Sequence, residues 1–198
     1  MYSLPLLSCC SVHEHLLLEL SERYFQLLVA SGLKPNTKAY NCLINAYAKV
    51  GKTEEAMDTL CKMEAVGVRA SVVTFNTLLD ASARKGDINC AKIFFEMMVE
   101  RSLQPNERSY SSLIHATCQA GENDLALNIV DHMKSLGLSP NDVTYSLILH
   151  GFGNAGNLQK AFEVLNLMRK DNCHPNVVTM TSLLHNCGRH GHLDKGEF

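Results

Sequence analysis

Residues 72–106, VVTFNTLLDASARKGDINCAKIFFEMMVERSLQPN, are one copy of a unit that recurs every 35 residues along most of the chain. A glycine returns at this interval near the middle of each copy, both before and after this stretch. These glycines are Gly51, Gly86, Gly121, Gly156 and Gly191. Self-similarity at a fixed interval of about 20–50 residues is typical of repeat architectures. The fold is therefore predicted unit by unit.

Three further columns keep the same interval. A proline followed by Asn ends most copies, while an alanine and a methionine recur in the second half. The prolines are Pro35, Pro105, Pro140 and Pro175, and the last residues of the copies are Asn36, Ser71, Asn106, Asn141 and Asn176. The alanines are Ala56, Ala91, Ala126 and Ala161, and the methionines are Met63, Met98, Met133 and Met168. This register predicts four complete units at 37–71, 72–106, 107–141 and 142–176, a truncated unit at 177–198, the second half of a degenerate unit at 21–36, and a poorly matching segment at 1–20.

Each unit is expected to form two helices that pack as an antiparallel hairpin. In residues 72–106, apolar side chains follow a helical spacing on both sides of Gly86. Glycine reaches the left-handed conformation that ends a helix. Just after the glycines, Thr53, Asp87 and Asn157 are expected to cap the second helices, and the Asn or Ser that ends each unit is expected to cap the next first helix.

A single hairpin cannot bury both of its apolar faces, so neighbouring hairpins must stack. The predicted fold is an all-α, right-handed α-solenoid of stacked antiparallel helical hairpins, with the first helices lining a concave surface. The 198 residues are 46% hydrophobic and 19% charged, which excludes a disordered chain. No stretch is long and apolar enough to predict a membrane span. Eight scattered cysteines argue against a disulfide scaffold, and Cys42, Cys90 and Cys118 are expected to be buried.

The segments Val72–Leu79, Val143–Ile148 and Leu138–Asn141 resemble the pentatricopeptide repeat, in the subfamily whose units are uniformly 35 residues long. Tetratricopeptide repeats are excluded because they have 34 residues and an opening Trp, whereas this chain has no Trp. The resemblance implies binding of single-stranded RNA, one base per unit, in RNA processing, stability or translation. It also implies a mitochondrial or chloroplast location, although residues 1–22 lack the Arg of a transit peptide. With partial units at both ends, the chain is expected to be a fragment or a truncated product.

By the same resemblance, each base is read by the fifth residue of a unit together with the last residue. These pairs are Asn41 with Ser71, Asn76 with Asn106, Ser111 with Asn141, and Ser146 with Asn176, and Thr181 belongs to a fifth pair. The second residue of a unit stacks on the base; Val73, Val143 and Val178 fit this role, while Lys38 and Arg108 depart from the aliphatic pattern. The pairs imply the preferred order 5′-C-Y-A-A-3′. For the last residues, a role limited to helix capping stays open.

The placement of charge supports a groove that follows a phosphate backbone. The whole chain has a net charge of −2, but the expected first-helix segments 37–50, 72–85, 107–120, 142–155 and 177–190 together carry +3. Lys49, Arg84 and Arg189 share one column near the end of the first helix and are predicted to contact phosphate. The alternative is that they only interact favourably with a helix C-terminus.

Other functions have weaker support in the sequence. A scaffold that binds a peptide helix is the main alternative to RNA binding, and a remnant without activity is another. A processing enzyme is a candidate second partner, and uncovered apolar ends are expected to favour self-association. No catalytic motif predicts an enzyme, and no cofactor is expected. His185, Cys187, His190 and His192 cluster without the spacing of a zinc finger, and His13-Glu14-His15 lacks metalloprotease spacing, so no metal site is predicted.

Overall fold

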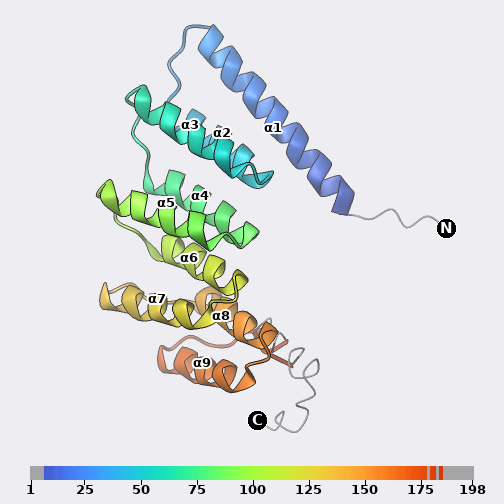
Figure 1. Cartoon of the computed structure of the whole chain (residues 1–198), viewed down its shortest axis with the longest axis vertical. Coiled ribbons are helices and arrows are strands. Elements are labelled where there is room, and N and C mark those ends of the chain that lie inside the picture. The colour runs from blue at the N-terminus through green and yellow to red at the C-terminus, as the bar shows by residue number, and fades with distance from the viewer. Residues whose placement is uncertain (1–6, 178, 182, 185–198) are drawn as a thin grey trace, which may run out of the picture. The chain divides into compact units, whose positions relative to one another are not determined.

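The computed structural model describes residues 7–177, 179–181 and 183–184, and every regular element in these ranges is a helix (Figure 1). The first is α1 (Leu7–Ala30), which precedes the complete units. The expected pairs of helices follow: α2 (Thr37–Lys49) and α3 (Thr53–Ala65), α4 (Val72–Lys85) and α5 (Ile88–Glu100), α6 (Glu107–Gln119) and α7 (Asn123–Ser135), and α8 (Asp142–Asn154) and α9 (Leu158–Lys170). Residues 177, 179–181 and 183–184 are also helical.

Helix α1 crosses residue 20, where the sequence pattern placed a boundary, without a break. Its segment has neither Pro nor Gly and is rich in Leu and Glu, which are good helix formers. Residues 7–20 therefore belong to the same helix as the half unit that follows them.

The chain forms two compact parts. The first runs to Ala81 and includes Glu96–Gln104, and the second contains Ser82–Phe95 and continues from Pro105. In the first part, α1 packs on α2, and α2 packs on α3. In the second part, α6 contacts both α7 and α8, and α8 contacts α9 (Figure 1). Within this second part, first helices of consecutive units therefore pack directly against each other.

The alanine and methionine columns form the inside of the hairpins, as predicted. None of the four alanines and none of the four methionines has any exposed surface. Alanine allows close approach of helices, and methionine fills irregular gaps because its side chain is unbranched and flexible. In the second part, Ala126, Ala161 and Met168 join a cluster that contains Ile114 of α6, Ile148 of α8 and Val164 of α9. Burial of each large side chain in such a cluster contributes about 1.5–3 kcal/mol.

Asparagines cap the first helices, as predicted. Asn36, Asn106 and Asn141 have extended backbone angles, and the Oδ1 of each accepts the backbone N–H three residues later. The second helices are capped less uniformly. Asp87 Oδ1 accepts from Cys90 N at 3.0 Å, and Asn157 Oδ1 accepts from Lys160 N at 3.2 Å.

The prediction that Thr53 caps α3 is wrong. Thr53 is the first helical residue, and Lys52 holds the cap position without a side-chain hydrogen bond. In its place, Lys52 forms an ion pair with Glu55 at 3.8 Å. The reason for the shift is one residue of spacing: Asp87 and Asn157 directly follow their glycines, whereas Lys52 stands between Gly51 and Thr53.

A second column of left-handed residues, which the sequence analysis did not identify, ends the second helices. These residues are Gly32, Gly67, Ser102, Gly137 and Asn172, again 35 residues apart, with φ of 76°, 81°, 57°, 75° and 57°. The column was not recognised in the sequence because two of its members, Ser102 and Asn172, are not glycine. The left-handed conformation costs an L-residue roughly 1–2 kcal/mol, and Asn tolerates it better than Ser. Ser102 is therefore the most strained residue of this column.

Gly151 is required by a close helix contact in the second part. A Cβ at this position of α8 would lie 2.2 Å from Asn123 Oδ1 and 3.2 Å from Cys118 Cβ. Asn123 is 5% exposed, and its Oδ1 has no hydrogen-bond partner within the described chain. Since the side chains of Asn123 and Cys118 occupy this space, a Cβ at position 151 would force them or α8 to shift.

Replacing Ser102 with glycine is expected to raise the free energy of unfolding by about 0.5–1 kcal/mol. Glycine removes the left-handed strain, and this gain exceeds its larger entropy in the unfolded chain. Chemical denaturation followed by circular dichroism measures the change. Asn172→Gly should give a smaller gain, and Gly137→Ala should destabilise, because the space around Gly137 is open and only its φ opposes a side chain. A loss of stability in Ser102→Gly would contradict this explanation.

Gly151→Ala is expected to destabilise the chain, although alanine favours an isolated helix over glycine by about 1 kcal/mol. The new Cβ overlaps Asn123 Oδ1, so α8 must shift from α7. Denaturation of Gly151→Ala, Asn123→Ala and the double variant forms a mutant cycle. Removal of the Asn123 amide should recover part of the loss. Additive effects of the two changes would show that this contact is not the cause.

Candidate nucleic-acid interface

A buried threonine hydroxyl joins the predicted pair Ser111 and Asn141. Ser111 lies in α6, and Asn141 caps α8, the first helix of the next unit. Thr144, the third residue of that unit, has no exposed surface. Its Oγ1 lies 3.1 Å from Ser111 Oγ and donates to Asn141 Oδ1 at 3.1 Å. The same Asn141 Oδ1 also accepts from Thr144 N at 3.0 Å.

The pair Ser146 and Asn176 has the same arrangement one unit later. Thr179, which is 1% exposed, places its Oγ1 2.7 Å from Ser146 Oγ. Thr179 Oγ1 donates to Asn176 Oδ1 at 3.0 Å, and Thr179 N donates to the same oxygen at 2.9 Å. Asn176 Nδ2 donates to Asp142 Oδ2 at 3.3 Å.

In the first part, Thr74 joins Asn41 and Ser71 in the same way, but with the amide and hydroxyl exchanged. Thr74 Oγ1 donates to Asn41 Oδ1 at 2.7 Å. Ser71 N donates to Thr74 Oγ1 at 3.1 Å, and the two hydroxyl oxygens lie 3.3 Å apart. Three of the predicted pairs are thus each brought together around one buried hydroxyl. We call the hydroxyls of Thr74, Thr144 and Thr179 the bridging hydroxyls.

The members of the remaining pair lie in different compact parts. Asn76 is only 5% exposed. In the second part, Asn106 Oδ1 accepts from Ser109 Oγ at 3.1 Å, and Ser109 Oγ accepts from Asn106 N at 3.2 Å. Ser109, which is fully buried, holds the same place in its unit as the bridging threonines. Thr181, predicted for a fifth pair, is exposed and donates to Val177 O at 2.7 Å.

Exposed aliphatic side chains accompany two of the pairs. Val73 and Val143 are 63% and 55% exposed, and each lies three residues before a predicted base-reading residue, Asn76 and Ser146, on the same helix. Residues three apart share a helix face, so each valine offers an apolar surface beside a polar side chain. Lys38 and Arg108, at the same place in their units, are exposed. The side chain of Val178 lies outside the described residues.

The predicted phosphate column is exposed where the structure describes it. Lys49 and Arg84 lie in the last turns of α2 and α4, and Arg189 falls outside the described residues. In α6 and α8 this column holds Gln119 and Asn154. Each of these amides contacts a histidine one turn earlier: Gln119 Nε2 lies 3.2 Å from His115 Nε2, and Asn154 Nδ2 lies 3.2 Å from His150 Nδ1. These histidines were not among the predicted site residues, although His115 and His150 each stand four residues before the amide that they contact.

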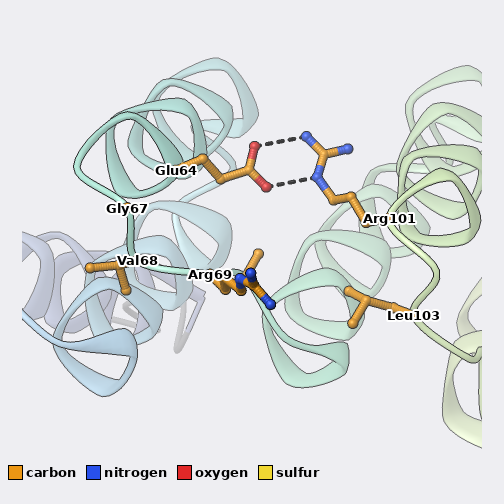
Figure 2. A pocket seen from close by; sticks show the side chains of 7 residues that line it. Glu64, Gly67, Val68, Arg69, Arg101 and Leu103 are labelled. Carbon is orange, nitrogen blue, oxygen red and sulfur yellow. Dashed lines mark hydrogen bonds and ion pairs between the residues drawn. The ribbon is translucent and has the colours of Figure 1, made fainter.

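A hollow of about 590 Å³ lies in the first part, beside the end of α3 (Figure 2). Arg101 faces Glu64 across it, with Nε and Nη2 donating to the two carboxylate oxygens at 2.7 and 2.8 Å. These hydrogen bonds hold the pKa of Glu64 below its usual range. Arg101 also lies over the Phe75 ring, 5.5 Å from its centroid. These contacts tie Arg101 to α3 and α4.

No group of three His, Cys, Asp or Glu residues in the described ranges could hold a metal ion. The discounted cluster His185, Cys187, His190 and His192 lies outside those ranges, and so does much of the truncated unit. The described helices include none that is long and apolar enough to cross a membrane. The expectation that Cys42 is buried is wrong, because its side chain lies on an exposed face of α2. Cys90 and Cys118 are half-buried, and burial raises the pKa of the Cys118 thiol to about 12.

Sequence profiles of pentatricopeptide repeats match most of the chain. The profile described as the pentacotripeptide-repeat region of PRORP matches residues 88–196. Profiles of the PPR repeat family and of the pentatricopeptide repeat domain match residues 35–84 and 60–112. No curated protein sequence matches the chain.

Solved structures of pentatricopeptide repeat proteins have a similar fold. The crystal structure of PPR10 from maize is 29% identical, with a TM-score of 0.67 over 92% of this chain and 27% of that chain. PPR10 in complex with an 18-nt psaJ RNA element is 25% identical, with a TM-score of 0.72 over 93% of this chain and 29% of that chain. The PPR domain of Arabidopsis thaliana protein-only RNase P 1 in complex with tRNA is 23% identical, with a TM-score of 0.64 over 77% of this chain and 80% of that domain. The chain spans less than a third of PPR10. These likenesses confirm the predicted α-solenoid of stacked helical hairpins.

Proposed function

The chain belongs to the pentatricopeptide repeat family, and we propose that it is a sequence-selective single-stranded RNA-binding module that reads one base per 35-residue unit. The observation that carries this proposal is the recurrence of the hydroxyl-linked pairs. Asn41 with Ser71, Ser111 with Asn141, and Ser146 with Asn176 each present uncharged donors and acceptors on neighbouring helices. Such groups match the edges of nucleotide bases.

In the proposed complex, each base lies against the second residue of a unit and turns its edge toward the fifth and last residues. Val143 supplies an exposed apolar surface for stacking, with Ser146 three residues further along the same helix. At the second position of two units, Lys38 and Arg108 place a long aliphatic stem over the base and a charged head near phosphate. Lys49 and Arg84 contact the backbone and contribute affinity without sequence preference.

The proposed module acts by occupancy in organellar RNA processing, stability or translation. Bound RNA is protected at an end, kept unpaired, or held for a processing enzyme, and the chain itself performs no catalysis. PPR10, which was solved with an 18-nt psaJ RNA element, supports this mode through 25% identity over nearly the whole chain. The proposed location is the mitochondrion or chloroplast. Four bases occur too often in a transcriptome for unique targeting, so further repeats or partners contribute to selection.

Lys49→Gln is expected to lower the affinity for all single-stranded RNAs to a similar degree. If Lys49 neutralises one phosphate, the slope of log affinity against log salt falls in magnitude by about 0.7. Fluorescence anisotropy at four salt concentrations measures the slope, and Arg84→Gln should behave alike. Lys62→Gln is the matched control, because Lys62 is an exposed residue in the last turn of a second helix. An unchanged slope in Lys49→Gln, or an equal fall in Lys62→Gln, would remove this column from the interface.

Ser111→Asn is expected to change the preference at the third base alone. The proposed order is 5′-C-Y-A-A-3′, because the short Ser111 leaves room for a purine and the longer Asn suits a pyrimidine. The third base should shift from adenine toward cytosine or uracil by about 1–3 kcal/mol, the usual cost of one mismatched position. Binding is measured against all four bases at each position, and the other three positions serve as controls. A variant that keeps its helical signal and the parent's preferences would show that residue 111 does not read a base.

A further inference from the structure

We propose that Thr144 and Thr179, together with Thr74 in the first part, are positioning residues that determine base specificity in the preceding unit. This inference rests on the proposed function, since it concerns how the same pairs are set up to bind RNA. Each threonine is the third residue of its unit, but the pair that it holds reads the base of the unit before. Recognition of one base therefore depends on side chains from two consecutive units.

The hydrogen bonds of Thr144 fix which way the Asn141 amide faces. A backbone N–H can only donate, so the Asn141 atom that faces Thr144 N at 3.0 Å is the carbonyl oxygen. The Thr144 hydroxyl donates to the same oxygen at 3.1 Å. With Oδ1 occupied twice, the amide presents its Nδ2 donor away from the helix end. Asn176 Oδ1 likewise accepts from Thr179 N and Oγ1, which fixes the same orientation of the amide, and its Nδ2 donates to Asp142 Oδ2 at 3.3 Å.

The number of hydroxyl hydrogens determines which group donates in the contact between Ser111 and Thr144. Thr144 has one hydroxyl hydrogen, and Asn141 Oδ1 takes it, so the 3.1 Å contact between the two hydroxyls needs the hydrogen of Ser111. Ser111 Oγ is thereby held at a defined place beside the amide. Its hydrogen can rotate about the C–O bond to a base acceptor without movement of the oxygen. The pair is therefore preorganised before a base binds, and this preorganisation lowers the entropic cost of binding.

The first pair has the opposite polarity. Thr74 donates to Asn41, so the outward amide donor belongs to the fifth residue of the unit, while Ser71 supplies the hydroxyl. In the pairs held by Thr144 and Thr179, the amide belongs to the last residue and the hydroxyl to the fifth. The positions of the amide and the hydroxyl are therefore exchanged in the first unit relative to the third and fourth units. This reversal is a physical basis for different bases at these positions.

Burial makes the bridging hydroxyls effective. Thr74 and Thr144 have no exposed surface, and Thr179 is 1% exposed. Buried polar groups without a partner cost about 1–3 kcal/mol, so these hydroxyls keep their protein partners in the free chain. Thr144→Val has nearly the same shape and retains the backbone N–H that donates to Asn141, the residue that caps α8. It removes only the link between Ser111 and Asn141.

The test is the binding of oligonucleotides that carry 5′-CUAA-3′ and all its single-base variants to the full chain and to Thr144→Val. We expect the parent's preference at the third base to fall at least about fivefold, toward the loss of one mismatch discrimination, while the first-base preference stays unchanged. Thr144→Ser should restore the third-base preference, because it returns the hydroxyl and the chain itself uses Ser109 at this place. Thr74→Val should give the converse result, with loss at the first base alone.

The outcomes separate this inference from the proposed function. A parent chain that binds every oligonucleotide equally overturns both. A parent with base preferences that Thr144→Val and Thr74→Val retain overturns the positioning role alone. Loss at all four bases, or failure of Thr144→Ser to restore the preference, also overturns it, because it indicates a general structural effect. Circular dichroism of each variant reports whether the helices remain.

Discussion

The structure depends on one constraint, which is that a helical hairpin cannot bury both of its faces without a neighbour. The buried alanine and methionine columns meet this constraint, since they let hairpins approach closely at a constant interval of 35 residues. In the second part, the contact of α6 with α8 shows its result: first helices of consecutive units lie side by side. A side chain on one first helix therefore meets a side chain a nearly fixed number of residues later.

This constant offset explains the bridging hydroxyls. Asn41 meets Thr74, Ser111 meets Thr144, and Ser146 meets Thr179, and each contact spans 33 residues. The offset is two residues shorter than the unit because the fifth residue of one unit faces the third residue of the next. The same threonines also contact the residues that cap the next first helix. Packing between hairpins thus joins the two members of each of these pairs through a hydroxyl that the next unit supplies.

Much of the fold follows from the sequence because each column has a strong local cause. Glycine at 86 and 121 permits a left-handed turn, and asparagine at 106 and 141 accepts the first free N–H groups of a helix. Exceptions arise where another residue takes the place of the expected one. Ser102 adopts the left-handed conformation without being glycine, so the second turn column escaped detection.

The candidate site was predictable only in part. The pairs came from resemblance to a family, with the fifth residues expected in first helices and the last residues expected just before them. Their connection through Thr144 was not predictable, because a threonine near a helix start is usually interpreted as part of a cap or a core. The 33-residue contact requires knowledge of how hairpins stack. Exposure was also difficult to predict: Cys42 is exposed and Asn76 is buried, although both lie on first helices.

The most direct measurement of the central claim is selection of bound sequences from a random single-stranded RNA pool, with single-stranded DNA as the control. If each unit reads one base through a pair held by the next unit, the bound RNAs will be enriched in 5′-C-Y-A-A-3′. The selected positions will also be consecutive, because the units follow one another along the chain at a constant interval of 35 residues. Enrichment of no sequence over the starting pool, or equal binding of RNA and DNA, would contradict the claim that these pairs read RNA bases.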